Sequence, residues 1–187
     1  MKVEGALGKL VMSLNRAGVP HMIAGSFAST FHGLSRTTVD IDVVIDPNPS
    51  SLSFLLNLLA EQGFYVSEAN ARAAFRLRTQ FNVIHMAHVW KVDLIIRKER
   101  PFSYTEFNRR EAATILEVDT FVASAEDTIL AKLEWSKESD SERQRRDIEG
   151  IIQIKGHGLD RGYLERWSKE LGVSDALSRL PWPKVGS

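Results

Sequence analysis

Two carboxylates, two residues apart beside an apolar run, are the feature that most constrains how this chain folds. Asp40-Ile41-Asp42 leads directly into apolar residues that end at Ile45. Alternation of acidic and apolar residues predicts a β-strand, in which residues i and i+2 point to the same face. Asp40 and Asp42 would then lie side by side, about 6–7 Å apart at Cα. Their charges repel each other, and a divalent cation between them would relieve that repulsion.

A Gly-Ser pair precedes these acids. An apolar stretch from Val19 to Ala24 predicts a short strand that runs into Gly25-Ser26. Ser26 is of the residue type that caps a helix, and that helix would run to His32 before Gly33 ends it. Backbone N–H groups at such a helix start, together with the serine hydroxyl, are suited to bind phosphate oxygens.

A third acid lies further along the chain. Asp93 is embedded in the apolar segment from Trp90 to Ile96, which predicts a strand. An acid in such a segment must be paired, protonated or bound to a metal, because burying it alone costs several kcal/mol. Three acids on one sheet face would form an oxygen-ligand site suited to Mg²⁺ or Mn²⁺. Two such ions can support an in-line phosphoryl or nucleotidyl displacement.

The rest of the chain predicts mixed α/β structure first and helices last. Expected helices before residue 122 span about 4–17, 50 or 51 to 63, and 102–109. Residues 64–96 are expected to be mostly extended, with alternation at Phe75 to Arg78 and strands at 82–86 and 90–96, and another strand is expected at 113–118. Ser124 is expected to cap the first of the C-terminal helices. This order predicts an α+β fold, a mixed sheet with flanking helices over 1–122 followed by a helical subdomain over 123–187.

The sequence resembles the nucleotidyltransferase superfamily that shares the DNA polymerase β palm. The residues that carry the resemblance are Gly25-Ser26, the Asp40 and Asp42 pair, and Asp93. The resemblance implies a palm-type sheet. It also implies that Asp40, Asp42 and Asp93 hold Mg²⁺ or Mn²⁺, Asp93 completing the second metal site or acting as a base. Gly25 and Ser26 would bind the phosphates of an NTP co-substrate.

Further matches bring the sequence nearest to minimal bacterial nucleotidyltransferases, among them the AbiEii-like toxins of type IV toxin–antitoxin systems. These are Arg36 just before the acids, Glu126-Asp127, Lys132 one turn later, and the 143–147 segment RQRRD. The resemblance implies that Lys132 neutralises the triphosphate as pyrophosphate departs and that Arg36 steadies the turn or the phosphates. A toxin role would imply a cognate antitoxin as partner.

We therefore expect an enzyme that transfers NMP from an NTP to an acceptor and releases pyrophosphate. By the resemblance, the acceptor is RNA such as a tRNA end, a protein hydroxyl, or a small molecule such as an aminoglycoside. Lys+Arg and Asp+Glu both number 24, and this neutral total argues against a non-specific nucleic-acid binder. Arg72, Arg76 and Arg78 would still be able to line a basic rim. The alternative is a catalytically silent nucleotide-binding or protein-interaction module with the same fold.

Composition excludes other classes of site. The chain has no cysteine, which excludes disulfides and thiol catalysis. No run approaches the about 18 apolar residues of a membrane span, and the N-terminal residues do not resemble a signal peptide. A cytoplasmic protein is expected.

Several candidates also have a purely structural interpretation. Ser26 would serve as a helix cap alone, and the Lys132 stem would lie along an apolar stripe with its charge in water. Arg143 and Asp147 are four residues apart and would pair on a helix surface, with substrate contact as the alternative.

Other motifs favour packing over chemistry. His85-x-x-His88 lacks a third zinc ligand at a suitable spacing. The Gly156-His157-Gly158 segment follows a helix, so a helix C-cap is expected instead of a nucleotide-binding turn. Trp135, Trp167 and Trp182 are expected to pack within the C-terminal helices.

Overall fold

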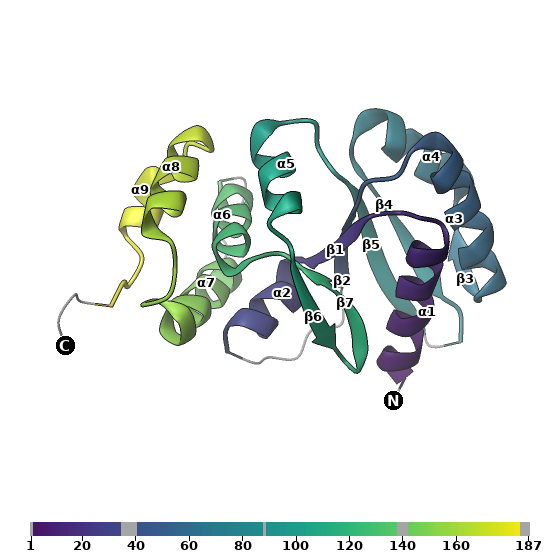
Figure 1. Cartoon of the computed structure of the whole chain (residues 1–187), viewed down its shortest axis with the longest axis horizontal. Coiled ribbons are helices and arrows are strands. Elements are labelled where there is room, and N and C mark those ends of the chain that lie inside the picture. The colour runs from purple at the N-terminus through teal and green to yellow at the C-terminus, as the bar shows by residue number, and fades with distance from the viewer. Residues whose placement is uncertain (1, 35–40, 88, 138–141, 184–187) are drawn as a thin grey trace.

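The computed structural model describes residues 2–34, 41–87, 89–137 and 142–183. Within these residues the chain forms one seven-stranded mixed sheet with helices around it (Figure 1). The strands are β1 His21–Ala24, β2 Ile41–Ile45, β3 Phe64–Val66, β4 Gln80–His85, β5 Trp90–Ile96, β6 Glu111–Ile115 and β7 Val118–Val122. The helices are α1 Lys2–Arg16, α2 Gly25–His32, α3 Pro49–Glu61, α4 Glu68–Leu77, α5 Pro101–Asn108, α6 Ala125–Ser136, α7 Glu142–Lys155, α8 Arg161–Glu170 and α9 Ser174–Ser178.

The strand order is β3-β4-β5-β2-β1-β7-β6, which places β2 and β1 at the centre of the sheet. β2 is antiparallel to β1 and parallel to β5, and β4 is antiparallel to β5. The alternating sequence of β2 explains its central position. Ile41, Val43 and Ile45 are buried on one face, while Asp42 and Val44 are half-buried on the other.

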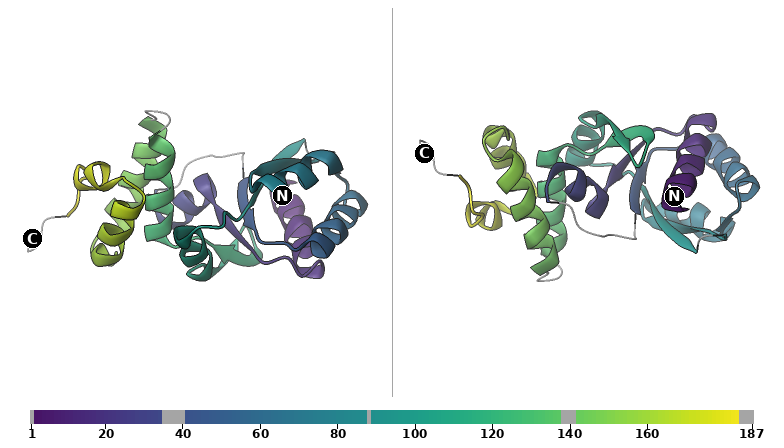
Figure 2. Two further views of the ribbon diagram at one scale, coloured as in Figure 1. Left: turned by 90° about the horizontal axis from the view of Figure 1, so that it is seen from above. Right: turned by 90° about the horizontal axis from the view of Figure 1, so that it is seen from below.

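Two hydrophobic clusters stabilise the molecule. The larger cluster lies between the sheet and helices α1, α3 and α4, and the second joins helices α6 to α9 with Phe102 of α5. Figure 1 and both views of Figure 2 show α6–α9 gathered at one end of the molecule. Helix α2 contacts β1 and β2 on one side and α6 and α7 on the other. The division at residues 122 and 123 stays a prediction, which the two clusters favour.

The structure confirms the predicted α+β order but corrects one long segment. Residues 68–77 form helix α4, so the extended structure expected from the alternation at Phe75 to Arg78 was wrong. The Ser67 hydroxyl caps this helix by accepting a hydrogen bond from the Asn70 N–H. The segment also holds four alanines, the residue with the highest helix propensity. Local capping and propensity outweighed a short alternating pattern.

Two smaller expectations were also wrong. Helix α3 is capped by Asn48 and not by either of the two serines that follow Pro49, because Pro49 itself is the first helical residue. The strand expected over residues 113–118 is instead the end of β6, a turn, and the start of β7. Leu116 and Glu117 both have positive φ, as a two-residue type I′ hairpin turn requires.

No helix in the described part of the chain is long and apolar enough to cross a membrane.

Candidate active site

Parallel pairing of β2 and β5 brings two of the three predicted acids together. Asp42 and Asp93 are register partners in this pair, so both side chains point to the same face of the sheet. Neighbouring strands lie about 4.8 Å apart, which lets the two carboxylates share one cation. Asp40 immediately precedes β2 and lies outside the described residues, as does Arg36. Among the residues that are described, no group of three or more acidic or imidazole side chains forms a complete metal cage.

The Asp93 carboxylate is in the condition expected of a metal ligand. Its side chain is 13% exposed, and its Oδ2 accepts a hydrogen bond from Lys91 Nζ at 3.1 Å. Its Oδ1 is buried and has no hydrogen-bond partner in the described structure. An unsatisfied buried acceptor costs about 1–3 kcal/mol, and more when it is charged. This donor set of two carboxylates with a buried lone oxygen fits Mg²⁺ or Mn²⁺.

Gly25 sits directly against the first of these carboxylates. The preceding residue, Ala24, is the register partner of Asp42 in the antiparallel β1–β2 pair. A Cβ atom on Gly25 would lie 1.9 Å from Asp42 Oδ2, far inside contact distance. Gly25 also has φ of +58°, a conformation that favours glycine. Both the backbone angle and the close carboxylate therefore require a glycine here.

Helix α2 begins beside the same carboxylate. It starts at Gly25, two residues earlier than expected, and its N-cap is Ala24, which makes no side-chain capping bond. The interpretation of Ser26 as the N-cap was therefore wrong. Ser26 lies in the first turn, where backbone N–H groups lack intrahelical partners and the helix dipole is positive. This end of the helix is suited to bind an anion such as a phosphate. The Asp42 carboxylate beside it would repel that phosphate, and a cation bound between the two would offset the repulsion.

Lys132 is buried between two helices. Its side chain is 6% exposed, and Nζ donates to Asp147 Oδ2 at 2.9 Å and to Gln144 Oε1 at 2.7 Å. The structural alternative, in which its charge reaches water from an apolar stripe, was therefore wrong. The expected Arg143–Asp147 surface pair was also wrong, because Asp147 is buried against Lys132 while Arg143 is exposed.

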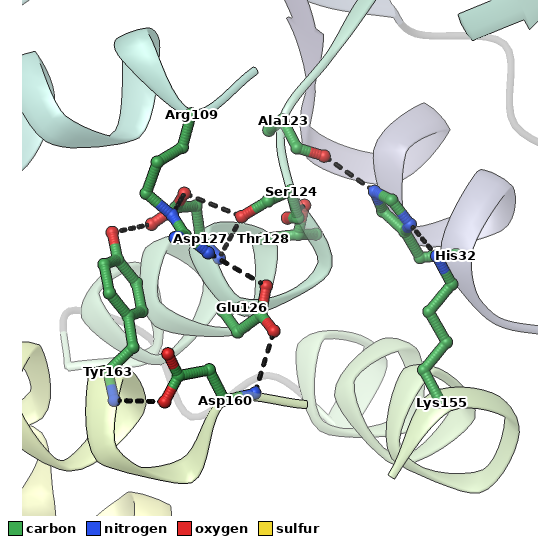
Figure 3. A network of polar contacts seen from close by, with 10 residues as sticks. All are labelled: His32, Arg109, Ala123, Ser124, Glu126, Asp127, Thr128, Lys155, Asp160 and Tyr163. Atoms are coloured by element: carbon green, nitrogen blue, oxygen red, sulfur yellow. Dashed lines mark hydrogen bonds and ion pairs between the residues drawn. The ribbon is translucent and has the colours of Figure 1, made fainter. Parts of the chain in front are cut away.

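A second polar network ties helices α5, α6 and α8 together (Figure 3). Ser124 caps α6 as predicted, accepting from the Asp127 N–H at 3.1 Å, and its hydroxyl donates to Asp127 Oδ2 at 2.7 Å. Tyr163 OH donates to Asp127 Oδ1 at 2.5 Å, and Arg109 Nε donates to Oδ2 at 3.2 Å. Burial raises the pKa of Asp127, while these donors favour its charged form.

Glu126 extends this network. Arg109 donates to its Oε2 at 3.3 Å, and the backbone N–H of Asp160, the cap of α8, donates to its Oε1 at 3.0 Å. The Glu126-Asp127 dipeptide that resembles the family pattern thus joins α6 to α8 and to Arg109 at the end of α5. Neither Arg109 nor Tyr163 could be found from the sequence, because both lie far from Asp127 along the chain.

His32 fixes the far end of α2 (Figure 3). Its ring is fully buried, and Nε2 lies 2.7 Å from the Ala123 carbonyl, which can only accept. Nε2 therefore carries the proton, and Nδ1 accepts from Lys155 Nζ at 2.9 Å. Burial lowers the pKa of His32, and the neighbouring Lys155 charge lowers it further, so the ring is neutral. Sequence reasoning did not single out this residue.

Helix α5 carries another group that sequence reasoning missed. Glu106 lies near Asp127, Arg100 and Glu134, and burial raises its pKa to about 8, helped by the Asp127 charge. Arg100 donates to both oxygens of Glu134, which lowers the pKa of that carboxyl. Glu106 is therefore a proton-carrying acid at neutral pH.

The remaining sequence candidates have structural roles or lie outside the description. His88 is outside the described residues, so the His85-x-x-His88 pattern stays untested. Trp167 and Trp182 pack on the second cluster as expected, but Trp135 is 59% exposed, so that expectation was wrong. Helix α7 ends at Lys155, directly before Gly156-His157-Gly158, which agrees with a helix end.

Comparison with known proteins places this geometry in a known fold. No family model and no curated protein matches the chain. The crystal structure of ANT(2'')-Ia in complex with adenylyl-2''-tobramycin matches with a TM-score of 0.62 and 13% identity, covering 92% of this chain and 98% of that chain. An antigenic nucleotidyltransferase-like protein from Paracoccidioides brasiliensis has a TM-score of 0.61 and 17% identity, and the match covers 94% of this chain and 86% of that chain. The lincomycin-bound lincosamide antibiotic adenylyltransferase LnuA has a TM-score of 0.57 and 12% identity, and the match covers 82% of this chain and 98% of that chain.

The chain therefore has the α+β nucleotidyltransferase fold with C-terminal helices, as the sequence predicts. At these identities the likeness concerns the fold alone. No comparison tests the individual site residues.

Proposed function

We propose that this protein is a nucleotidyltransferase that moves NMP from an NTP to an acceptor hydroxyl. The observation that carries the proposal is the register of Asp42 and Asp93 on adjacent strands, with Gly25 and the start of α2 against Asp42. Three features of the superfamily motif, far apart in the sequence, meet at one place. A fold kept for packing alone has no physical reason to place two acids side by side.

In the proposed reaction, Asp40, Asp42 and Asp93 hold Mg²⁺ or Mn²⁺. The ion would neutralise phosphate charge and lower the pKa of the acceptor hydroxyl. The first-turn N–H groups of α2, beginning at Gly25 and Ser26, bind the β- and γ-phosphate oxygens. These groups are fixed before substrate arrives, since β1 anchors one end of α2 and His32 the other.

Asp93 is the group we propose for proton acceptance. Its carboxylate, which would hold the ion through one oxygen, takes the proton from the acceptor hydroxyl with the other, and the hydroxyl oxygen then forms a bond to the α-phosphorus. The α–β phosphoanhydride bond breaks in line with this attack, and pyrophosphate leaves with the electron pair. Arg36 is proposed to supply positive charge for the triphosphate, a role that rests on the sequence resemblance. The same resemblance proposes this role for Lys132, whose ammonium would first have to leave Asp147 and Gln144.

Transfer of label from α-labelled NTP tests this function. Asp42→Asn and Asp93→Asn each keep the side-chain shape but remove a ligand charge, so Mg²⁺-dependent transfer and pyrophosphate release should fall at least about 100-fold. Asp175→Asn changes an exposed acid on α9 and serves as the matched control. Undiminished transfer by both site variants would contradict the proposal. NTP binding by the wild type without pyrophosphate release would instead match a catalytically silent module.

We extend the proposal to acceptor and role. Of the fold neighbours, one is in complex with adenylyl-2''-tobramycin and another is a lincosamide antibiotic adenylyltransferase, so small hydroxyl compounds are the first acceptors to test. The AbiEii-like toxin role, with a cognate antitoxin, is a proposal from the sequence resemblance. Growth arrest of a bacterial host by the wild type, but not by Asp42→Asn, would support it, and equal growth would oppose it. We place the reaction in the cytoplasm.

A further inference from the structure

We propose that the acceptor binds on the open face of strands β3 to β5, and that it is a small uncharged hydroxyl compound that carries an apolar ring. This inference rests on the proposed transfer reaction, because it names the substrate class of the same site. Three side chains, Tyr65 of β3 with Ile84 and Asn82 of β4, form what we call the acceptor face. Tyr65 is 60% exposed, Asn82 is exposed and Ile84 is half-buried.

Strand register places the acceptor face on the same side of the sheet as the two acids. Asn82 is the register partner of Asp93 in the antiparallel β4–β5 pair, and directly opposite residues point to one face. Tyr65 is the register partner of Ile84, which lies two residues from Asn82 on β4 and therefore shares its face. The Asn82 side chain thus lies beside Asp93, about 5 Å away at Cβ, and Tyr65 lies about 12 Å from Asp93 at Cα.

The helices that pack on these strands lie on the other side of the sheet. Phe64, Phe81 and Val83 alternate with the residues of the acceptor face along β3 and β4. These three are buried in the larger hydrophobic cluster together with residues of α3 and α4. Tyr65 and Asn82 are exposed instead, so a molecule from solvent can reach them.

The order of the strands puts the acceptor face and the proposed phosphate site on opposite sides of the two acids. In the row that crosses the sheet, Asn82 of β4 is followed by Asp93 of β5, Asp42 of β2 and Ala24 of β1. Gly25 and the start of α2 come directly after Ala24, at the far end of this row. An acceptor on β4 would therefore attack from the side opposite the phosphates, as an in-line displacement requires.

Exposed apolar side chains give the acceptor face its preference for an apolar ring. The Tyr65 ring stands beside Ile84, and the turn that joins β4 to β5 adds Met86 and Val89, which are 63% and 84% exposed. Exposed apolar surface next to a polar site is typical of a place where a ligand binds, and a tyrosine ring packs well against another ring. The span of about 12 Å from Tyr65 to Asp93 suits two linked rings, of which the second carries the reacting hydroxyl.

The charge of these strands disfavours RNA as the acceptor. Lys91 is the one cationic side chain in β3, β4 and β5 if histidine is neutral, and its Nζ already donates to Asp93 Oδ2 at 3.1 Å. Binding a phosphodiester backbone depends on cations that neutralise phosphates. The arginines expected to line a basic rim, Arg72, Arg76 and Arg78, belong to α4 and its C-terminal cap, and α4 packs on the other side of the sheet.

The same strands disfavour a polycationic acceptor. A polycation needs carboxylates to pair with, and Asp93 is the one acid of β3, β4 and β5, where it is the proposed base and metal ligand. Asn82 offers an uncharged amide in its place. An amide both donates and accepts hydrogen bonds, as hydroxyl groups do, so it can hold a hydroxyl beside Asp93.

Two glucosides that differ in one ring test the acceptor face in the full-length protein. Phenyl β-D-glucoside and methyl β-D-glucoside serve as acceptor probes with α-labelled ATP and Mg²⁺. We expect the wild type to use both, with a KM about three- to tenfold lower for the phenyl compound, the contribution of one ring contact. Tyr65→Ala should remove this preference, and Tyr65→Phe should keep it. Asn82→Ala should raise both KM values about three- to tenfold, the loss of one hydrogen bond.

Phe54→Ala is the matched control, because it removes an exposed ring from α3 and should leave both KM values unchanged. A binding measurement separates this inference from the proposed function. Saturation-transfer NMR detects phenyl β-D-glucoside on the protein without turnover, so it reports on the acceptor face even if no transfer occurs. Weaker binding to Tyr65→Ala than to Tyr65→Phe, Phe54→Ala and the wild type would support the acceptor face.

Three results would overturn the inference. These are label that appears only in tRNA or protein, equal behaviour of Tyr65→Ala and Phe54→Ala, and a wild type that does not bind the phenyl glucoside. Binding that depends on Tyr65 as expected, without any ATP conversion, would instead count against the transfer reaction.

Discussion

Replacing Gly25 by alanine tests the close approach between α2 and Asp42. The new Cβ would lie 1.9 Å from Asp42 Oδ2 and 2.8 Å from its Cγ, where ordinary contacts begin near 3.4 Å. The carboxylate must therefore move by more than about 1 Å. A displacement of about 1 Å at a catalytic group can cost about 100-fold in rate. Gly25→Ala should reduce nucleotidyl transfer by at least that factor.

The backbone cost of the same change can be separated by a matched control. Gly18 has φ of +61°, nearly the +58° of Gly25, but an added Cβ there would meet nothing within 4 Å. Gly18→Ala should therefore carry the backbone penalty of about 1–2 kcal/mol alone. Both free energies of unfolding are measured by urea denaturation, and transfer is measured from α-labelled NTP at saturating Mg²⁺. Equal transfer rates in the two variants would refute the reasoning.

Three further predictions concern stability. Asp147→Asn removes the carboxylate to which the buried Lys132 ammonium is bonded, and should lower the free energy of unfolding by about 3 kcal/mol in urea melts. Ser124→Ala removes both the cap of α6 and a donor to Asp127, and should cost about 1–2 kcal/mol by thermal unfolding. Glu106 has a pKa raised to about 8, so the folded state keeps a proton that the unfolded state loses above its ordinary pKa. Wild-type stability should therefore fall as pH rises from about 5 to 8, by up to about 1.4 kcal/mol per unit, and Glu106→Gln should remove this slope.

Controls and contrary outcomes for these three are simple. Asp175→Asn and Glu117→Gln change exposed acids, and both should leave unfolding and its pH dependence unchanged. A loss under 1 kcal/mol in Asp147→Asn would mean that the buried pair contributes little. Wild-type behaviour of Ser124→Ala would contradict the capping role. A pH slope that survives in Glu106→Gln would assign that slope to another group.

The parts of this fold that could be predicted from the sequence are those set by local patterns. β5 begins at Trp90 and ends at Ile96 as expected, because a segment rich in apolar and β-branched residues specified it. The Gly25 position could be found because the motif contains it, yet its steric reason needed the register of Ala24 against Asp42. Helix α4 could not be found from alternation, since capping by Ser67 and the alanine content decided it.

Long-range polar contacts were beyond sequence reasoning. Asp127 is bonded to Arg109 and Tyr163, which lie 18 and 36 residues away, and no periodicity links such positions. The same holds for Lys132, whose partner Asp147 became visible only when α6 and α7 packed together. The sequence indicated which residue types would matter at the site, and the packing decided which of them meet.

The most direct test of the central claim is a Mn²⁺ titration of the protein with a non-hydrolysable ATP analogue, followed by electron paramagnetic resonance. If Asp42 and Asp93 share a cation, the wild type binds Mn²⁺, and Asp42→Asn and Asp93→Asn each weaken that binding at least about tenfold while Asp175→Asn does not. Unchanged Mn²⁺ affinity in both site variants would contradict the account.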